Sequence, residues 1–270
     1  MTGDGSPSSL TQQAIDSLRS RLPALPTVGV ILGSGLGRFA DQLPILATIP
    51  YTEIPGFAAC SAAGHAGRLV LTDRCGPRVA ILQGRVHRYE GHSLETVTRP
   101  VRVLAGLGVK TLIVTCAAGA LDDAQPGTLL LIEDHLNLMG DNPLAGAGFQ
   151  FVEMARAYDP DLLGQAEGAA RAAGLPVRRG ILAAVTGPSY ETAAEAAMLA
   201  RLGAHAVSMS VVPEVIVARA LGLRVLGLAL LTNRAGAPLS QQQGHELVVA
   251  EAERRAASVG AVLEGVLRRL

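Results

Sequence analysis

Residues 28–37 have the sequence VGVILGSGLG, and this stretch indicates the class of fold. Residues 28–32 form a short run of apolar, partly β-branched residues, which is typical of a buried strand. The run passes directly into Gly33-Ser34-Gly35-Leu36-Gly37, where glycines permit a tight turn and a close approach of the backbone to a ligand. We expect this turn to hold an anion at the start of a helix, and the alternative is a tight turn that binds nothing.

Strand-like and helix-like segments alternate through most of the chain. Apolar runs bounded by turn residues predict strands over residues 28–32, 68–71, 78–82, 111–115, 128–132, 181–185, 204–209 and 225–231. Helical spacing of apolar residues predicts helices over residues 94–107, 161–173, 192–202, 213–221 and 246–270. This alternation predicts an α/β fold whose largely parallel or mixed sheet has helices on both faces.

The composition fits a single folded domain. The chain has 270 residues, of which 49% are apolar, so we expect one domain over residues 1–270, with residues 1–9 flexible. Lys and Arg together number 23, as do Asp and Glu, and the formal net charge is zero. A general nucleic-acid or membrane-surface binder carries a strongly basic surface, so neither partner is expected.

Cysteine usage and the first residues predict a cytoplasmic protein. Cys60, Cys75 and Cys116 are an odd number in no metal-ligand spacing, which indicates neither a disulfide framework nor a zinc site. Residues 1–9 lack the basic start and apolar run of a secretory leader, and no segment approaches 18 consecutive apolar residues. We therefore expect a protein that is neither secreted by that route nor membrane-spanning.

Polar residues follow the strand expected at residues 78–82. Ligands of open α/β sheets bind at the carboxyl ends of strands, and the next residues are QGRVHRYEGH. Alternation places Arg85, His87 and Tyr89 on one side, where a guanidinium, an imidazole and a phenol can converge on one polar ligand. The alternative is an exposed charged loop.

Two other strands lead into residues suited to a flat ligand. The small residues of TCAAGA at 115–120 leave room for a ligand to meet backbone N–H groups, unless they serve close helix–sheet packing. In GPSYE at 187–191, Tyr190 can stack on a heterocycle and Glu191 can accept a ring N–H, unless Glu191 is a helix cap. Asn233, after the last expected strand, can both donate and accept.

Seven motifs occur in the order seen in trimeric purine nucleoside phosphorylases, and the chain closely resembles that family. The motifs are GSGLG at 33–37, GHAGR at 64–68, GRVHRYEG at 84–91, AAG at 117–119, GPSYET at 187–192, MSVVPEV at 209–215 and TN at 232–233. The resemblance implies a mixed sheet partly closed into a barrel and flanked by helices, assembled as a homotrimer. It also implies a pentosyltransferase that converts a purine nucleoside and inorganic phosphate into free base and ribose 1-phosphate, with no metal or organic cofactor.

The resemblance implies a role for each matching residue. Phosphate would be bound by Ser34, Arg85, His87, the Ala117 N–H and Ser210, and the sugar by Tyr89, Met209, His245 and the Phe151 of a neighbouring subunit. The base would be bound by Tyr190, Glu191 and Asn233. The residues expected to take part in catalysis are His87, Glu191 and Asn233, and His65 and Cys116 are further candidates.

The residues on the base side predict a preference among purines. Asn233 can donate to a 6-oxo group and stabilise N7 as negative charge develops in the base. Ionised Glu191 accepts the N1–H of a 6-oxopurine but meets a lone pair on adenine N1. We therefore expect inosine and guanosine to be preferred to adenosine.

Four residues depart from the family pattern, and three other functions remain as alternatives. Cys116 stands where the family usually has asparagine, Ser208 and Ala120 replace glycines, and Tyr190 replaces a more common phenylalanine. The nearest alternative is a methylthioadenosine phosphorylase-like enzyme. A non-catalytic nucleoside-binding protein is a second, and a dinucleotide-dependent oxidoreductase built on residues 33–37 is a third.

Overall fold

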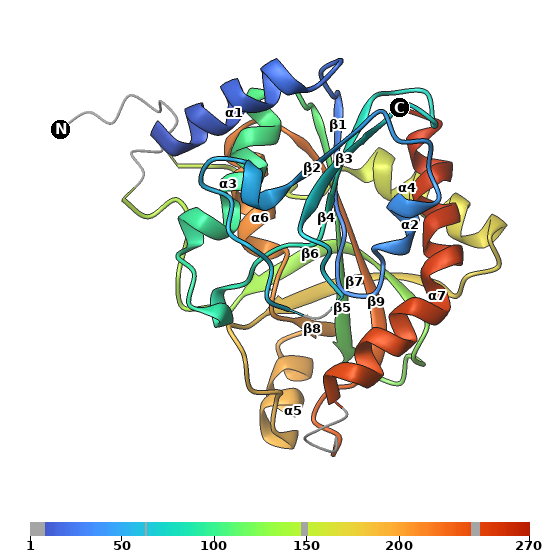
Figure 1. The fold of residues 1–270 in the computed structure, drawn as a ribbon. Helices are drawn as coiled ribbons and strands as arrows, with labels where there is room; N and C mark the ends of the chain where they lie inside the picture. The colour runs from blue at the N-terminus through green and yellow to red at the C-terminus, as the bar shows by residue number, and fades with distance from the viewer. Residues whose placement is uncertain (1–8, 63, 147–150, 239–243) are drawn as a thin grey trace.

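The computed structural model describes residues 9–62, 64–146, 151–238 and 244–270. Its strands form one sheet, shown in Figure 1. They are β1 (Val28–Ile31), β2 (Ala47–Pro50), β3 (Arg68–Thr72), β4 (Val79–Gln83), β5 (Thr111–Ala120), β6 (Leu129–Asn137), β7 (Val177–Ala184), β8 (Ala206–Ser208) and β9 (Arg224–Arg234). The helices are α1 (Ser9–Arg21), α2 (Arg38–Asp41), α3 (Leu94–Gly106), α4 (Pro160–Ala172), α5 (Ala193–Arg201), α6 (Val212–Ala220) and α7 (Gly244–Leu267).

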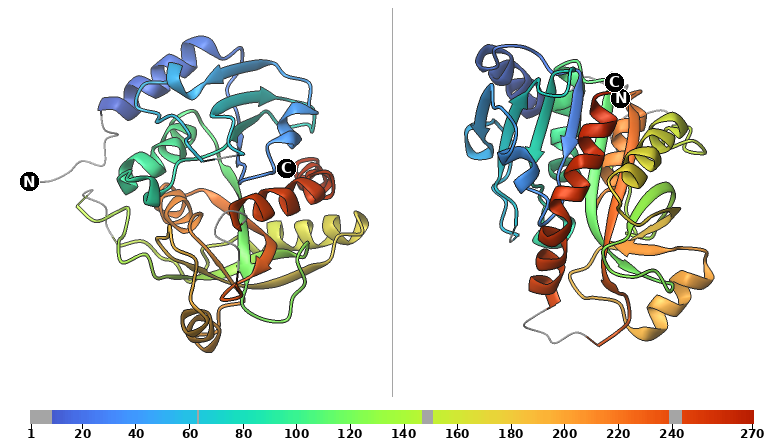
Figure 2. Two further views of the ribbon diagram at one scale, coloured as in Figure 1. Left: turned by 60° about the horizontal axis from the view of Figure 1, so that its bottom comes forward. Right: turned by 90° about the vertical axis from the view of Figure 1, so that its right-hand side faces the viewer.

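The sheet is mixed and partly closed into a barrel. Its strand order is β2-β3-β4-β1-β5-β8-β7-β6-β9, and β9 pairs back onto β5, so that β5, β8, β7, β6 and β9 form a closed ring. Strand β1 lies parallel to β4 and β5, and β5 lies parallel to β9, whereas β5–β8 and β6–β9 are antiparallel. In Figure 2, β2, β3 and β4 lie on one side of the molecule and the barrel strands on the other. The expected mixed, partly closed sheet is therefore confirmed.

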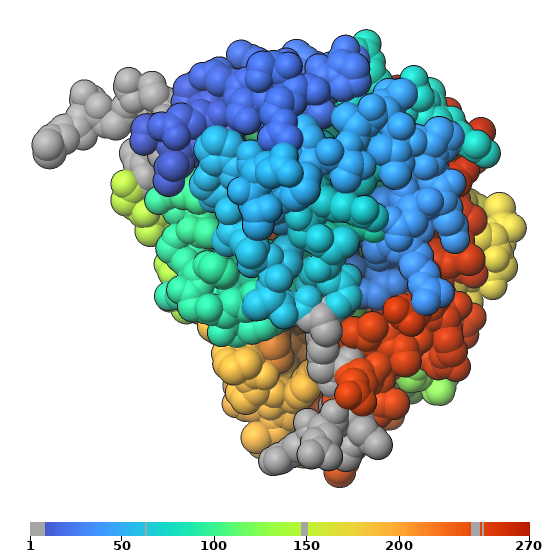
Figure 3. Space-filling view, viewed as in Figure 1, coloured from blue at the N-terminus to red at the C-terminus, as the bar shows by residue number. Residues whose placement is uncertain are grey.

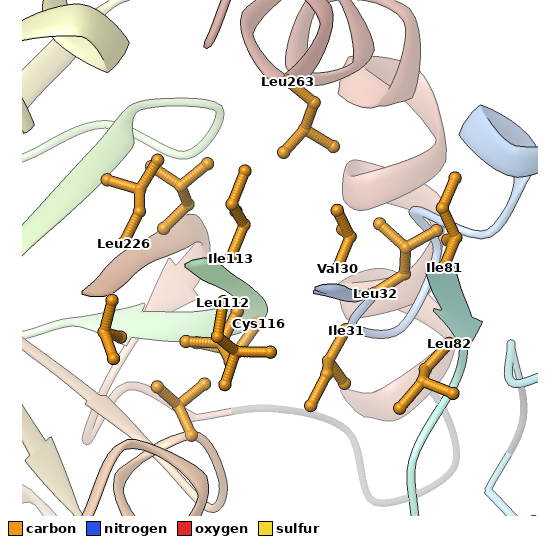
Figure 4. Packing of buried hydrophobic residues seen from close by; sticks show 14 of the residues in the cluster. Val30, Ile31, Leu32, Ile81, Leu82, Leu112, Ile113, Cys116, Leu226 and Leu263 are labelled. Carbon is orange, nitrogen blue, oxygen red and sulfur yellow. The ribbon is translucent and has the colours of Figure 1, made fainter. Parts of the chain in front are cut away.

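Helices pack against both faces of the sheet. Helices α1, α3 and α6 lie together on one side, and α2, α4 and α7 lie on the other (Figure 1). Figure 4 shows Val30 and Leu32 pointing towards the face where Leu263 of α7 lies, and Ile31 pointing to the opposite face. All four side chains are buried. Burial on both faces explains why this strand is apolar at every position and not only at alternate ones.

The structure corrects several expected boundaries. Strands β5, β6 and β9 extend three to five residues beyond the ends of the runs expected for them, because polar or small residues continue the ladder around the barrel. The edge strand β2 and the largely polar helix α1 are absent from the sequence prediction, since their apolar residues are few. Ser9 begins α1, which corrects its assignment to a flexible start, and residues 1–8 lie outside the described residues.

The first glycine turn does not lead into a long helix. Helix α2 spans only Arg38–Asp41, so the expected anion site at a helix start is wrong in that detail. Within the described ranges, no helix is long and apolar enough to cross a membrane.

Candidate active site

A cavity opens at the carboxyl ends of the parallel strands β1, β4, β5 and β9. In the space-filling view, α5 and the beginning of α7 form this end of the molecule (Figure 3). The lining residues include most of those expected from the sequence: Ser34, Arg85, His87, Tyr89, Cys116, Ala117, Tyr190, Glu191, Ser208, Met209, Ser210 and Asn233. The fold therefore brings together residues from six separate segments.

The turn after β1 is held against β5. The Gly33 N–H donates to Thr115 Oγ1 at 2.9 Å, and a Cβ on Gly33 would lie 2.8 Å from the Cys116 Cα. Only glycine allows this approach without moving backbone atoms. The turn thereby carries Ser34 to the cavity wall.

His65 orients the Ser34 hydroxyl. The backbone N–H of Arg85 donates to His65 Nδ1 at 3.3 Å, and His65 Nε2 lies 3.0 Å from Ser34 Oγ. Because Nδ1 accepts, a neutral His65 carries its proton on Nε2 and donates it to Ser34. The Ser34 O–H is then available as a donor to a ligand, so His65 acts here through Ser34.

Arg85 is buried with an anionic partner. Its Nε lies 2.8 Å from Glu214 Oε1, and the two side chains are 4% and 2% exposed. Nη1 donates to the Thr115 carbonyl at 2.6 Å and Nη2 to the Ile31 carbonyl at 3.4 Å. Each terminal nitrogen has a second N–H that it can donate to a ligand.

His87 is held by Glu90, three residues further along. Both the His87 backbone N–H and its Nδ1 lie within hydrogen-bond distance of Glu90 Oε1, at 2.6 and 2.8 Å. Burial lowers the pKa of His87, and the Arg85 guanidinium lowers it further, so the imidazole is neutral near pH 7. Its proton then lies on Nδ1, and Nε2 is an acceptor. The Tyr89 ring stacks on His87, with centroids 4.6 Å apart.

Ser210 occupies a strained turn between β8 and α6. Val211 has φ 74° and ψ −54°, and the Val212 N–H donates to the Ser210 carbonyl at 2.9 Å, which together define a γ-turn. This conformation is rare for a β-branched residue and fixes Ser210 at the cavity. Ser208 Oγ donates to the Ala117 carbonyl at 3.1 Å and lies 3.3 Å from Ser210 Oγ.

The cavity is also lined by Tyr190, Glu191 and Asn233. Burial raises the pKa of Glu191. Thr192 and Glu195 form the N-terminal capping box of α5, so the alternative role of Glu191 as a helix cap is wrong. Thr232 Oγ1 donates to Asn233 Oδ1 at 3.0 Å, which fixes the amide oxygen.

Phe151, one of the expected sugar contacts, is not among the residues that line this cavity. Phe151 is fully exposed and lines a separate hollow with Leu144, Met154 and Ile216. Its expected contact with a neighbouring subunit stays a prediction. The side chain of His245 lies outside the described part of the chain, and its expected contact does so as well.

Comparison with known proteins identifies the family. The family model described as the phosphorylase superfamily matches residues 27–268. The chain is 43% identical over 265 residues to purine nucleoside phosphorylase 1 of Geobacillus stearothermophilus, an alignment that covers 96% of this chain and 97% of the relative. The chain belongs to the purine nucleoside phosphorylases of the phosphorylase superfamily.

Other relatives agree with this assignment. The chain is 45% identical over 249 residues to purine nucleoside phosphorylase 1 of Bacillus subtilis, which covers 90% of this chain and 92% of that protein. A Schistosoma purine nucleoside phosphorylase in complex with hypoxanthine superposes with a TM-score of 0.90 at 35% identity, covering 100% of this chain and 99% of the other. The Schistosoma mansoni enzyme has also been solved with adenosine and with inosine.

Membership of the purine nucleoside phosphorylases confirms the expected family and enzyme class. A dinucleotide-dependent oxidoreductase is therefore wrong. In the described segments, no group of three or more His, Cys, Asp or Glu residues could hold a metal ion.

Sequence reasoning missed several residues that shape this phosphorylase site. Glu90 and Glu214 had a usable signal, since both lie inside quoted motifs, GRVHRYEG and MSVVPEV. Thr115 likewise lies inside the quoted segment TCAAGA, whereas Val248 had no signal. Thr115 supports the first turn from a neighbouring strand, and Val248 lines the cavity from α7.

Proposed function

We propose that this chain catalyses reversible phosphorolysis of purine nucleosides and prefers 6-oxopurines. The observation that carries the proposal is the set of polar side chains that line one cavity. Oxyanion donors from Ser34, Arg85 and Ser210 line it together with Glu191 and Asn233, whose amide and carboxyl groups suit a purine edge.

The reaction divides charge in a way that this arrangement supports. A phosphate oxygen attacks C1′ as the C1′–N9 bond breaks, and the bonding electron pair moves into the purine. The sugar gains positive character beside the phosphate dianion, while the base gains negative charge near Asn233. Donors aimed at developing charge stabilise the transition state more than the substrate.

Holding phosphate, sugar and base together in one cavity supplies much of the expected rate acceleration. Arg85 and Ser34 offer N–H and O–H donors to phosphate, and neutral His87 can accept the proton of monohydrogen phosphate at Nε2. Met209 and Tyr89 line the cavity as the proposed sugar contacts, and His245 is proposed for the 5′-hydroxyl. None of these steps requires a metal or an organic cofactor.

The proposed preference for 6-oxopurines rests on Asn233 and Glu191. Thr232 donates to Asn233 Oδ1, and Asn233 Nδ2 donates to the Arg234 carbonyl at 3.4 Å, so the second amide N–H is the donor left to meet a 6-oxo oxygen or N7. Cys116 and Tyr190 line the same cavity. Where the family usually has asparagine, Cys116 supplies no amide, and where it more commonly has phenylalanine, Tyr190 adds a phenol hydroxyl. Inosine and guanosine are therefore the proposed substrates, and tolerance of 2′-deoxyribose follows if no group contacts the 2′-hydroxyl.

We further propose a homotrimer in which Phe151 covers a neighbour's sugar site. A fully exposed phenylalanine beside Met154 and Ile216 is costly in water and suits a protein interface. Phe151→Ala should raise the nucleoside KM and leave the phosphate KM unchanged, and light scattering reports whether three chains assemble. Cys60, Cys75 and Cys116 are all free thiols, which fits the proposed cytoplasmic location.

The decisive assay is release of free base from inosine, guanosine, adenosine and methylthioadenosine, each with and without inorganic phosphate. Release from inosine and guanosine, and only with phosphate, is the expected result. Equal kcat/KM for adenosine and inosine refutes the purine preference. Turnover of methylthioadenosine assigns the sister activity instead, and nucleoside binding without turnover assigns a binding protein.

A further inference from the structure

Ser208 is a buried serine at the end of β8 that the proposed reaction does not use. It lines the cavity although the residue is only 7% exposed, and Ser210, two residues further along, is 9% exposed. Ser208 is also one of the positions at which this chain departs from the family pattern, where it replaces a glycine. Its hydroxyl is therefore a feature of this chain's own cavity, and the hydrogen bonds of that hydroxyl indicate its effect.

The proton of Ser208 points to a backbone carbonyl. Ser208 Oγ lies 3.1 Å from the Ala117 carbonyl oxygen on β5 and 3.3 Å from Ser210 Oγ. A carbonyl oxygen can only accept, whereas a serine hydroxyl has one proton and two lone pairs. Both hydrogen bonds form together only if Ser208 donates to Ala117 and accepts from Ser210. The reverse direction, from Ser208 to Ser210, would remove the bond to Ala117, which is the shorter of the two.

Cys116 lies beside the same hydroxyl and does not change this direction. Burial raises the pKa of the Cys116 thiol to about 11, and the Arg85 guanidinium and a hydrogen bond with Ser208 oppose this effect. The thiol is therefore protonated near neutral pH. Its sulfur is a weaker acceptor than the Ala117 carbonyl oxygen, so the Ser208 proton stays on the carbonyl.

We propose that Ser208 is a positioning residue that holds the Ser210 proton, so that phosphate has to draw this proton away from Ser208 in order to bind through Ser210. The inference rests on the proposed function, since that function assigns phosphate to Ser210. With its proton on Ser208, Ser210 presents only lone pairs to the cavity, and these repel a phosphate oxygen. Ser208 thereby weakens phosphate binding by the value of the hydrogen bond that is given up.

Redirecting the Ser210 proton requires no movement of heavy atoms. The γ-turn at Val211 fixes the backbone beside Ser210, and the proton turns about the Cβ–Oγ bond. A hydrogen bond to an anionic oxygen is stronger than one between two hydroxyls, so phosphate takes the proton from Ser208. The loss of the hydroxyl–hydroxyl bond remains as a cost of phosphate binding, and removing the Ser208 hydroxyl removes that cost.

Ser208→Ala tests the competition, because it removes the acceptor and leaves Ser210 in place. We expect calorimetry with inorganic phosphate to give a Kd about threefold lower than that of the wild type, the value of a weak hydrogen bond between neutral groups. In initial-rate kinetics the phosphate KM should fall by a similar factor, with the nucleoside KM within about twofold. Loosened packing would weaken phosphate binding instead, so the sign of the change separates the two explanations. Ser208→Gly is the second variant and should lower the Kd as well.

A double-mutant cycle with Ser210→Ala tests the route of the effect. In the Ser210→Ala background there is no Ser210 proton to compete for, so adding Ser208→Ala should change the phosphate Kd by less than about 1.5-fold. The control is Thr98→Val, which also removes a buried hydroxyl that donates to a carbonyl, that of Leu94 within α3. It should leave the phosphate Kd and both KM values unchanged.

The outcomes separate this inference from the proposed function. Calorimetry measures phosphate binding without turnover, so if the wild type binds phosphate but cleaves no nucleoside, the proposed function fails and the comparison of variants still tests Ser208. The inference is overturned if Ser208→Ala and Ser208→Gly leave the phosphate Kd unchanged or raise it, if the tighter binding persists in the Ser210→Ala background, or if the wild type binds no phosphate.

Discussion

Thr115→Val should destabilise the protein and weaken phosphate binding, although it changes no residue that lines the cavity. Thr115 is fully buried, and its Oγ1 accepts from the Gly33 N–H at 2.9 Å and donates to the Ile31 carbonyl at 3.3 Å. Valine has nearly the same shape, so no cavity is created. The loss is confined to hydrogen bonding, which makes the magnitude tractable.

The expected cost is about 2–4 kcal/mol. A buried N–H left without a partner costs about 1–3 kcal/mol, and the lost bond to Ile31 adds about 1 kcal/mol. Ile31 still accepts from Arg85 Nη2, which limits the second contribution. In a chain of this size each kcal/mol lowers the Tm by roughly 2 °C or more, so a decrease of about 4–10 °C is expected.

Urea denaturation and initial-rate kinetics measure the two consequences. The turn that carries Ser34 should loosen, so the phosphate KM should rise several-fold while the nucleoside KM changes little. The control is Thr98→Val, whose hydroxyl donates to the Leu94 carbonyl within α3 and contacts no part of the site. A Thr115→Val protein within 1 kcal/mol of the wild type, or one with both KM values raised equally, refutes the reasoning.

Three further predictions concern the base, a thiol and pH. Asn233→Ala should lower kcat on the order of 10²-fold through loss of a donor to the developing charge, and a kcat within fivefold of wild type in the inosine assay contradicts that role. Burial raises the pKa of Cys116 to about 11, so the native protein should resist iodoacetamide at pH 8 and react in urea; mass spectrometry of the tryptic peptide distinguishes this from a reactive thiol. Because the pKa of folded His87 is lowered by burial below the unfolded value of about 6.5, its stabilising contribution is present above pH 6.5 and is lost as pH falls through the folded value. Unfolding free energies between pH 7.5 and 5.5 should therefore fall more steeply for the wild type than for His87→Gln, and equal slopes exclude this contribution.

Some elements of this fold could be predicted because their signals are local. Residues 28–32 are apolar at every position, and β1 occupies 28–31 of them. Ser93 precedes the predicted helix at 94–107 and caps α3 by accepting from the Thr96 N–H. Where apolar residues were sparse, as in β2, or where a strand continued through polar residues, as in β6, the pattern failed.

The candidate site was also predicted only in part from local sequence signals. Arg85, His87 and Tyr89 were expected on one side of an extended strand, and all three do line the cavity. They reach it differently, because β4 ends at Gln83 and Arg88–Glu90 is a 3-10 turn that stacks Tyr89 on His87. Alternation along a strand therefore predicted the correct three residues, although the strand does not extend through them.

The sequence by itself determined which residues follow each strand, and therefore which donors and acceptors a site at the strand ends could contain. Only the tertiary structure decided that β9 closes onto β5, that Glu214 lies 2.8 Å from Nε of Arg85, and that His65 lies between the Arg85 backbone N–H and Ser34 Oγ. Strand and helix signals lie within a few residues of one another and survive in the sequence. Pairings between distant segments depend on how the whole chain closes and packs, and no local pattern records that.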